Sequence, residues 1–282
     1  MCGRHGSTTW LPGPGVPTGS GNARGNYRFA VGTAGSATLV LQTVLPALLI
    51  ASGPSTLTLE GGTHNPMAPP FDFLARSFLP LIRRMGPSVD LELKRPGFFP
   101  AGGGLFHARI QPVKRLSALD LSERGAIRGR RAGAWLSKLP VPIAERELAV
   151  VREALGWRAD ECGVELVSHP TGPGNALVLE IEAAHVTGVF TGFGERGRPA
   201  EAVAQQAAEA ATRWLEAGVP VDEHLADQLL LPLALAGGGS FRTVAPTAHA
   251  TTNATIIERF LPLAIRFERE GELPWRATVG AR

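Results

Sequence analysis

One histidine, His249, is the side chain of this sequence best suited to nucleophilic chemistry. It lies in the run from Thr247 to Asn253, among alanines and hydroxyl side chains. A neutral imidazole can attack phosphorus and then leave, so histidine suits a transient nucleotidyl–enzyme bond. A lone histidine is more often structural or solvated, and the residues alone leave both roles open for His249.

Asp227 and Gln228 precede His249 and form a second group of candidates. They adjoin the apolar face of an expected helix, whose residues are spaced three or four apart: Leu225, Leu229, Leu233 and Ala236. The glycines 237–239 are expected to end this helix. A polar side chain beside an apolar face needs a partner when it is buried. These two residues therefore predict either a ligand site or a capped or hydrogen-bonded helix position.

Gln42 is a third candidate, because it interrupts an apolar helical run that ends near Leu49. Burying an amide without a partner is costly, so Gln42 is expected either to meet a ligand or to be a satisfied polar residue of the core.

Several segments together resemble the RNA 3′-terminal phosphate cyclases, and they occur in that family's order. In that family, a histidine followed four residues later by asparagine is the adenylylated nucleophile, as in His249 and Asn253. The resemblance covers about residues 27–270. It rests on this segment, on the run that begins at His224, and on residues 27–46, 61–66, 96–104 and 258–262.

The resemblance implies ATP as co-substrate, a Mg²⁺ or Mn²⁺ requirement, and His249 as the catalytic nucleophile. It implies a nucleotide-binding set made of Gln42, His224, Leu225, Ala226, Asp227 and Gln228. His224 departs from the tyrosine common at that position, which puts its stacking on adenine in doubt. No metal ligand and no oligomeric state follow from the sequence.

The reaction implied is ATP-dependent conversion of an RNA 3′-terminal phosphate to a 2′,3′-cyclic phosphate, through adenylyl-histidine and RNA-adenylate intermediates. The alternative is a non-catalytic cyclase-like scaffold that binds RNA in ribosome assembly. His249 favours the enzyme, because such scaffolds lack the nucleophile. Enolpyruvyl transferases share the repeated α/β unit, but a shared fold does not supply a function.

Other polar and glycine-rich segments admit both a functional and a structural interpretation. Residues 65–70 could line an adenine pocket or form a turn, and glycines 102–104 could approach phosphate or simply turn the chain. Basic residues could bind RNA phosphates or form a solvated face: Arg24, Arg28, Lys94, Arg95, Arg128, Arg130 and Arg131. Four histidines have no convincing metal-ligand spacing: His64, His107, His169 and His185.

Composition narrows the class of protein but not its chemistry. The 282 residues include 44% hydrophobic residues, enough for a substantial core, and a formal charge of +3, which permits a polyanionic partner without requiring one. The two cysteines, Cys2 and Cys162, indicate no disulfide framework. No segment has the pattern of a signal peptide or a membrane span, so a cytoplasmic protein is expected.

The order of apolar patterns predicts an α/β (α+β) fold. Residues 27–110 predict one β-α-β-α-β-β unit, and the resemblance implies repeats of it in a large domain at 27–124 and 218–282. A small thioredoxin-like α/β insert is expected at 125–217, and an irregular segment at 1–26. The first of the family's repeats, which would precede the unit at 27–110, is largely unmatched. We therefore expect the chain to be N-terminally truncated, with low stability and weak cyclisation.

Overall fold

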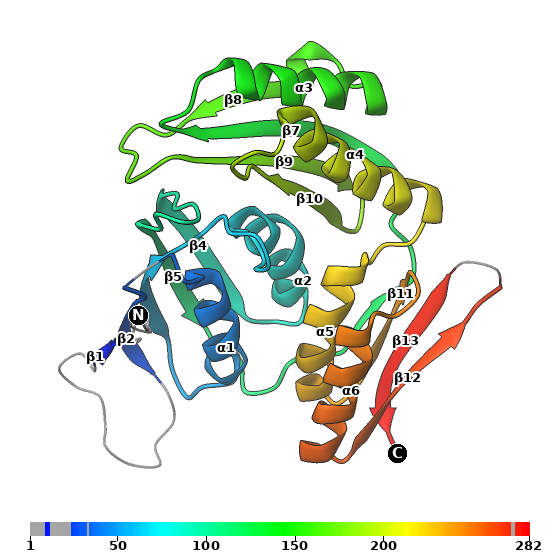
Figure 1. Ribbon diagram of the computed structural model, residues 1–282. Coiled ribbons are helices and arrows are strands. Elements are labelled where there is room, and N and C mark those ends of the chain that lie inside the picture. Colours follow the sequence, from blue (N-terminus) through cyan, green and yellow to red (C-terminus); the bar gives the residue numbers. More distant parts are fainter. Residues whose placement is uncertain (1–8, 12–23, 33, 272–273) are drawn as a thin grey trace, which may run out of the picture.

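The computed structural model describes residues 9–11, 24–32, 34–271 and 274–282, which form three mixed sheets with helices packed against them (Figure 1). The buried side chains form one continuous hydrophobic core through all three sheets. This arrangement confirms the predicted mixed α/β class. Within the described residues, no helix is both long and apolar enough to cross a membrane.

The first unit has the predicted β-α-β-α-β-β order. In chain order it consists of β2 (Gly25–Ala30), α1 (Ala37–Leu49), β3 (Ser55–Gly61), the π-helix η1 (Phe73–Phe78) with α2 (Leu79–Arg84), β4 (Ser88–Arg95) and β5 (Gly104–Gln111). Strand β3 forms because its side chains alternate, so that Leu57 and Leu59 are fully buried. Its neighbours in the sheet follow the order β2-β3-β5-β4, with β2 and β3 parallel.

A second unit repeats this topology. It consists of β6 (Leu119–Leu121), α5 (Glu223–Ala236), β11 (Gly239–Thr243), α6 (Ala248–Phe260), β12 (Leu263–Arg269) and β13 (Trp275–Ala281). Its sheet order, β6-β11-β13-β12, matches that of the first unit strand for strand, and the pair β6 and β11 is again parallel. Helix α5 packs against η1 and so joins the two units.

The third sheet lies between β6 and α5 in sequence and is drawn at the top of Figure 1. Its elements are β7 (Ile127–Ser137), α3 (Pro142–Leu155), the 3₁₀ turn η2 (Ala159–Glu161), β8 (Cys162–Leu166), β9 (Gly174–Ala183), β10 (Thr187–Phe193) and α4 (Ala200–Ala217). The sheet order is β10-β9-β7-β8, and α3 and α4 pack on the sheet. The position agrees with the predicted insert, whose domain boundaries stay a prediction.

Part of the segment expected to be irregular is regular. Strand β1 (Thr9–Leu11) pairs antiparallel with β2, so that Trp10 lies opposite Phe29. Residues 1–8 and 12–23 of that segment lie outside the described residues.

The buried carboxyl of Glu147 sets a pH dependence of stability. Glu147 lies on α3 and is fully buried; its Oε2 accepts a hydrogen bond from Asn175 Nδ2 at 3.0 Å, and its Oε1 has no partner among the described residues. Burial raises the pKa of Glu147 to about 7, although Asn175 and the Arg146 charge oppose the shift and Glu201 adds to it.

We expect Glu147→Gln to stabilise the protein at pH 8, by roughly 2–3 kcal/mol. The folded pKa lies above the unfolded one, so the contribution of Glu147 to stability is fully present below its unfolded pKa of 4.5 and is lost as the pH rises through about 7. Urea unfolding at pH 5 and pH 8 measures the difference. Glu145→Gln, at an exposed position of the same helix, is the control, and an unchanged pH slope in Glu147→Gln would contradict the expectation.

Candidate functional site

Asp227 is held in place by a residue from the next helix. The Asn253 amide on α6 donates from Nδ2 to Asp227 Oδ1 at 2.9 Å and to the Asp227 backbone oxygen at 3.1 Å. Helix α5 itself begins at the buried cap Asp222, whose Oδ1 accepts from His224 N at 2.8 Å and Leu225 N at 2.9 Å. The Asn253 amide therefore orients the Asp227 carboxylate.

Gln42 and Gln228 meet across the junction of the two units. The Gln42 Nε2 amide of α1 donates a hydrogen bond to Gln228 Oε1 of α5. Both side chains are half-buried, so the contact satisfies one polar group of each. The structure thus explains why an amide interrupts the apolar run of α1.

These side chains line one small pocket of about 120 Å³ between α1, η1, α5 and α6. Part of its lining is apolar and buried, at Leu45, Leu49 and Phe78. The lining residues are Gln42, Leu45, Pro46, Leu49, Phe78, Asp227, Gln228, Leu231, Pro232 and Asn253. A partly apolar lining with a few polar groups is typical of a small-molecule site.

His249 is the second residue of α6. Thr247 caps this helix, because its Oγ1 accepts from Ala250 N at 3.2 Å. His249 is exposed, and its position four residues before Asn253 places it on the same helix face, one turn from the Asp227 contact. A helix N-terminus favours anions, so a phosphate at His249 would meet a favourable field.

The other predicted nucleotide-binding residues lie outside the pocket lining. Leu225 and Ala226 are buried in the core, whereas the His224 side chain is 83% exposed, with Glu223 Oε1 3.9 Å from its Nε2. The structure therefore brings together Gln42, Asp227 and Gln228. The role assigned to His224, Leu225 and Ala226 stays a prediction.

His64 is part of a buried network. Its Nε2 lies 2.7 Å from Asp72 Oδ2 and its Nδ1 2.8 Å from Thr63 Oγ1, while its ring stacks on Phe98 and contacts Trp135 of β7. The hydrogen bond and the charge of His64 outweigh the opposing effect of burial, so the pKa of Asp72 is lowered. His64 therefore joins the first unit to the third sheet.

The two candidate loops make close structural contacts. Asn65 Nδ2 donates to Ala34 O at 2.5 Å and ties the turn before α1 to the loop after β3. A Cβ at Gly104 would lie 2.6 Å from Gly61 O, so glycine is needed there for close packing of two chain segments. Neither loop lines the pocket, and their nucleotide roles stay predictions.

Several predicted basic residues already have partners. Arg28 pairs with Glu60 at 2.6 Å, Lys94 pairs with Glu92, and Arg95 Nε donates to Gly103 O at 2.6 Å. Arg131 pairs with Glu165 at 2.6 Å. Arg24, Arg128 and Arg130 are exposed. The side chains of Arg28, Lys94, Arg95 and Arg131 are thus held by contacts within the protein.

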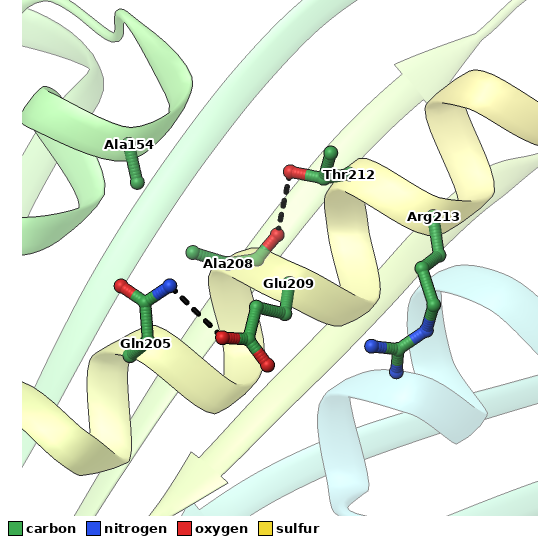
Figure 2. A pocket seen from close by; sticks show the side chains of 6 residues that line it. All are labelled: Ala154, Gln205, Ala208, Glu209, Thr212 and Arg213. Atoms are coloured by element: carbon green, nitrogen blue, oxygen red, sulfur yellow. Dashed lines mark hydrogen bonds between the residues drawn. The ribbon is translucent and has the colours of Figure 1, made fainter.

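A larger hollow of about 340 Å³ lies away from these residues, against α3 and α4 (Figure 2). Its polar groups bond within α4: Gln205 donates to Glu209 at 3.0 Å, and Thr212 donates to Ala208 O at 2.9 Å. None of the candidate residues predicted from the sequence lines it, so its size alone does not make it the site.

The described residues hold no group of three or more His, Cys, Asp or Glu side chains that could bind a metal. At the pocket, Asp227 supplies a single carboxylate. One carboxylate together with substrate phosphates is a common way to hold Mg²⁺, so the donor set fits a metal that arrives with a nucleotide.

A signal that the sequence analysis missed supports the pairing of α1 with α5. The pattern Gln-x-x-x-Pro occurs in both helices, at Gln42 and Pro46 and again at Gln228 and Pro232. All four residues line the pocket. Equivalent helices of two repeated units thus carry the same pattern, and internal comparison could have placed the two amides together.

The fold and the site together define a class: a repeated α/β protein with a small amide- and carboxylate-lined pocket beside an exposed histidine at a helix N-terminus. Residues 9–267 match the family model of the RNA 3′-terminal phosphate cyclases. The chain belongs to this family, which is a family of enzymes.

Curated relatives agree with the family model, and each is named RNA 3′-terminal phosphate cyclase. The chain is 54% identical over 241 residues to one from Pseudomonas aeruginosa (strain UCBPP-PA14), covering 86% of this chain and 70% of that one. It is 51% identical over 246 residues to one from Koribacter versatilis (87% and 69%). It is 47% identical over 249 residues to one from Salmonella agona (88% and 72%).

Proposed function

We propose that this protein uses ATP to convert an RNA 3′-terminal phosphate to a 2′,3′-cyclic phosphate, with His249 as the nucleophile. The observation that carries the proposal is the position of His249 at the start of α6, one turn from the Asn253–Asp227 contact. Family membership supports the reaction class. The names of the relatives favour this enzyme over the non-catalytic scaffold.

The proposed reaction has three displacements at phosphorus. An imidazole nitrogen of His249 attacks the α-phosphorus of ATP, pyrophosphate leaves, and the other ring nitrogen releases its proton to water. A terminal phosphate oxygen of the RNA then attacks the adenylyl phosphorus and breaks its bond to nitrogen, and the departing imidazole regains a proton from water. Finally the 2′-hydroxyl attacks the terminal phosphate, loses its proton to water and expels AMP.

The pocket residues contribute orientation and charge. We assign Gln42 and Gln228 to the polar edges of the nucleoside, because an amide can both donate and accept hydrogen bonds. Asp227 would hold the ribose or a water bound to Mg²⁺ or Mn²⁺, and such a metal would neutralise phosphate charge. The N-terminus of α6 would favour the negative phosphate beside His249. Positioning and charge neutralisation dominate catalysis of phosphoryl transfer.

The small pocket has a consequence for binding. Its volume of about 120 Å³ is below the roughly 300 Å³ of typical ligand pockets. The hydrogen bond between Gln42 and Gln228 joins two side chains of its lining. We infer that nucleotide binding breaks this bond and replaces it with contacts to the nucleoside.

The proposed cyclase reaction fits the cytoplasm, where ATP and RNA are both present. That location also stays a proposal.

We expect Asp227→Ala and Gln42→Ala each to weaken ATP-dependent labelling of the protein by about tenfold or more. Each substitution removes a polar contact worth roughly 1–3 kcal/mol in a closed site. Initial labelling rates with α-labelled ATP and Mg²⁺, across a range of ATP concentrations, measure the change. Gln205→Ala, at an exposed position of α4 outside this pocket, is the control. Normal ATP dependence in both pocket variants would make these side chains structural.

A further inference from the structure

Strand β8 forms an open edge of the third sheet. The sheet order is β10-β9-β7-β8, so β8 pairs with β7 on one side, and no described strand pairs with its other side. At the opposite edge, β10 lies against η1 of the first unit. Unpaired strand edges readily pair with another chain, and proteins usually protect them. We therefore expect the β8 edge to have either a partner strand or a feature that prevents pairing.

The register with β7 determines which backbone groups face outward. Strands β7 and β8 are parallel, and Val167 N donates to Leu136 O at 3.0 Å, directly after the strand. Because successive residues of a strand point their N–H and C=O groups to opposite sides, Gly163 and Glu165 also face β7. The outward groups belong to Cys162, Val164 and Leu166.

The side chains along β8 do little to protect this edge. Val164 is 36% exposed and Leu166 is 64% exposed, and with Cys162 they share one face of the sheet. The other face carries Gly163, beside which a Cβ would meet nothing within 4 Å, and Glu165. Glu165 is already paired with Arg131 at 2.6 Å. The strand has no lysine or proline, the residues that most often block edge pairing.

We propose that β8 pairs antiparallel with β8 of a second copy of this chain, around a two-fold axis at Val164. In this register Val164 lies opposite its own counterpart, and Cys162 lies opposite Leu166 of the other copy. Val164 then exchanges both N–H···O=C bonds with its counterpart, and Leu166 N donates to Cys162 O of the other copy, because the Cys162 N–H already donates to Ala159 O. The product is a closed, two-fold dimer with one continuous eight-stranded sheet.

The side chains match in this register, which is why a second copy is the partner we choose. Apolar Leu166 and Cys162 meet on one face, and Val164 meets Val164 between them. On the other face Glu165 lies opposite Gly163, where there is open space. The two Glu165 carboxylates are diagonal neighbours, and Arg131 offsets the charge of each. The inference does not depend on the proposed reaction.

The test uses directed disulfides in the full-length chain, with Cys2 replaced by serine. In Leu166→Cys, the new thiol lies opposite Cys162 of the other copy, at a Cα separation of about 5.5 Å, which suits a disulfide. We expect copper–phenanthroline to give a covalent dimer whose link joins residues 162 and 166. Adding Cys162→Ser to this variant should abolish the link, whereas Val164→Cys with Cys162→Ser should link residue 164 to itself.

Light scattering on a sizing column gives an independent readout. We expect the Cys2→Ser parent to elute as a dimer and Leu166→Lys to elute as a monomer with an unchanged circular dichroism spectrum. Failure of both cysteine variants to cross-link, or a monomeric parent at about 100 µM, would overturn the proposal. Cross-links confined to other positions would do the same. A β8 edge filled by a different protein would leave the pure chain monomeric and uncross-linked.

Discussion

Replacing His249 by alanine is expected to abolish covalent labelling of the protein by α-labelled ATP, with a loss of at least about 10³-fold. The proposed label requires a nitrogen nucleophile, and alanine supplies none. Because His249 is exposed, the variant should fold as the parent does. His169→Ala, which removes another exposed histidine, should label normally.

The chemistry of the bond gives a second check on the same variant. A phosphoramidate at histidine is lost in acid and kept in alkali, whereas an acyl phosphate at a carboxylate is lost in alkali. Peptide mapping should place the AMP group on His249. Equal labelling of His249→Ala, or an adduct mapped to another residue, would remove His249 as the nucleophile.

The largest effect on stability is expected from His64→Leu, at about 3–5 kcal/mol. The substitution leaves Asp72, which is only 15% exposed, without its partner at 2.7 Å. It also removes a contact with Trp135, which lies in the third sheet. The lowered pKa of Asp72 means that its contribution to stability is present above its unfolded pKa of about 3.8 and is lost as the pH falls through the lower folded value.

Chemical denaturation at pH 7 measures this prediction, and two variants control it. Asp72→Asn keeps a hydrogen-bond acceptor for His64 and should cost less than His64→Leu. The double variant with leucine at both positions should recover part of the loss, because no unpaired buried charge remains. A loss below about 1 kcal/mol in His64→Leu would mean that the pair contributes little.

Much of the fold follows from local sequence patterns. The alternation of Thr56–Leu59 and the helical spacing up to Leu49 gave the first unit in its correct order. Strands β7 and β10 escaped prediction, because glycines and arginines in β7 and three consecutive buried residues in β10 hide the alternation. Glu147 lies near the start of α3 and is buried, because packing of the helix on the sheet overrides the preference of a carboxylate for solvent.

Three polar residues of the pocket lining, Gln42, Asp227 and Gln228, were candidates from the sequence, but their contacts could not be predicted. Gln42 stood out as an amide in an apolar helix, and Asp227 as a polar residue beside an apolar face. The pairing of Gln42 with Gln228 depends on how α1 and α5 pack across the two units, which residues 186 apart in sequence do not specify. The same holds for Asn253 and Asp227. Only the repeated Gln-x-x-x-Pro pattern pointed to the first of these contacts.

The most direct test of the central claim is the fate of a defined RNA end. The protein should convert an RNA with a 3′-terminal phosphate to a 2′,3′-cyclic phosphate, releasing one AMP and one pyrophosphate for each end cyclised. An otherwise identical RNA with a 2′-deoxy terminal nucleotide should accept AMP and stop there, because the attacking hydroxyl is absent. Formation of the cyclic phosphate without ATP consumption would contradict the proposed cyclase reaction. So would adenylylation of His249 with no cyclic product from the 3′-phosphate RNA.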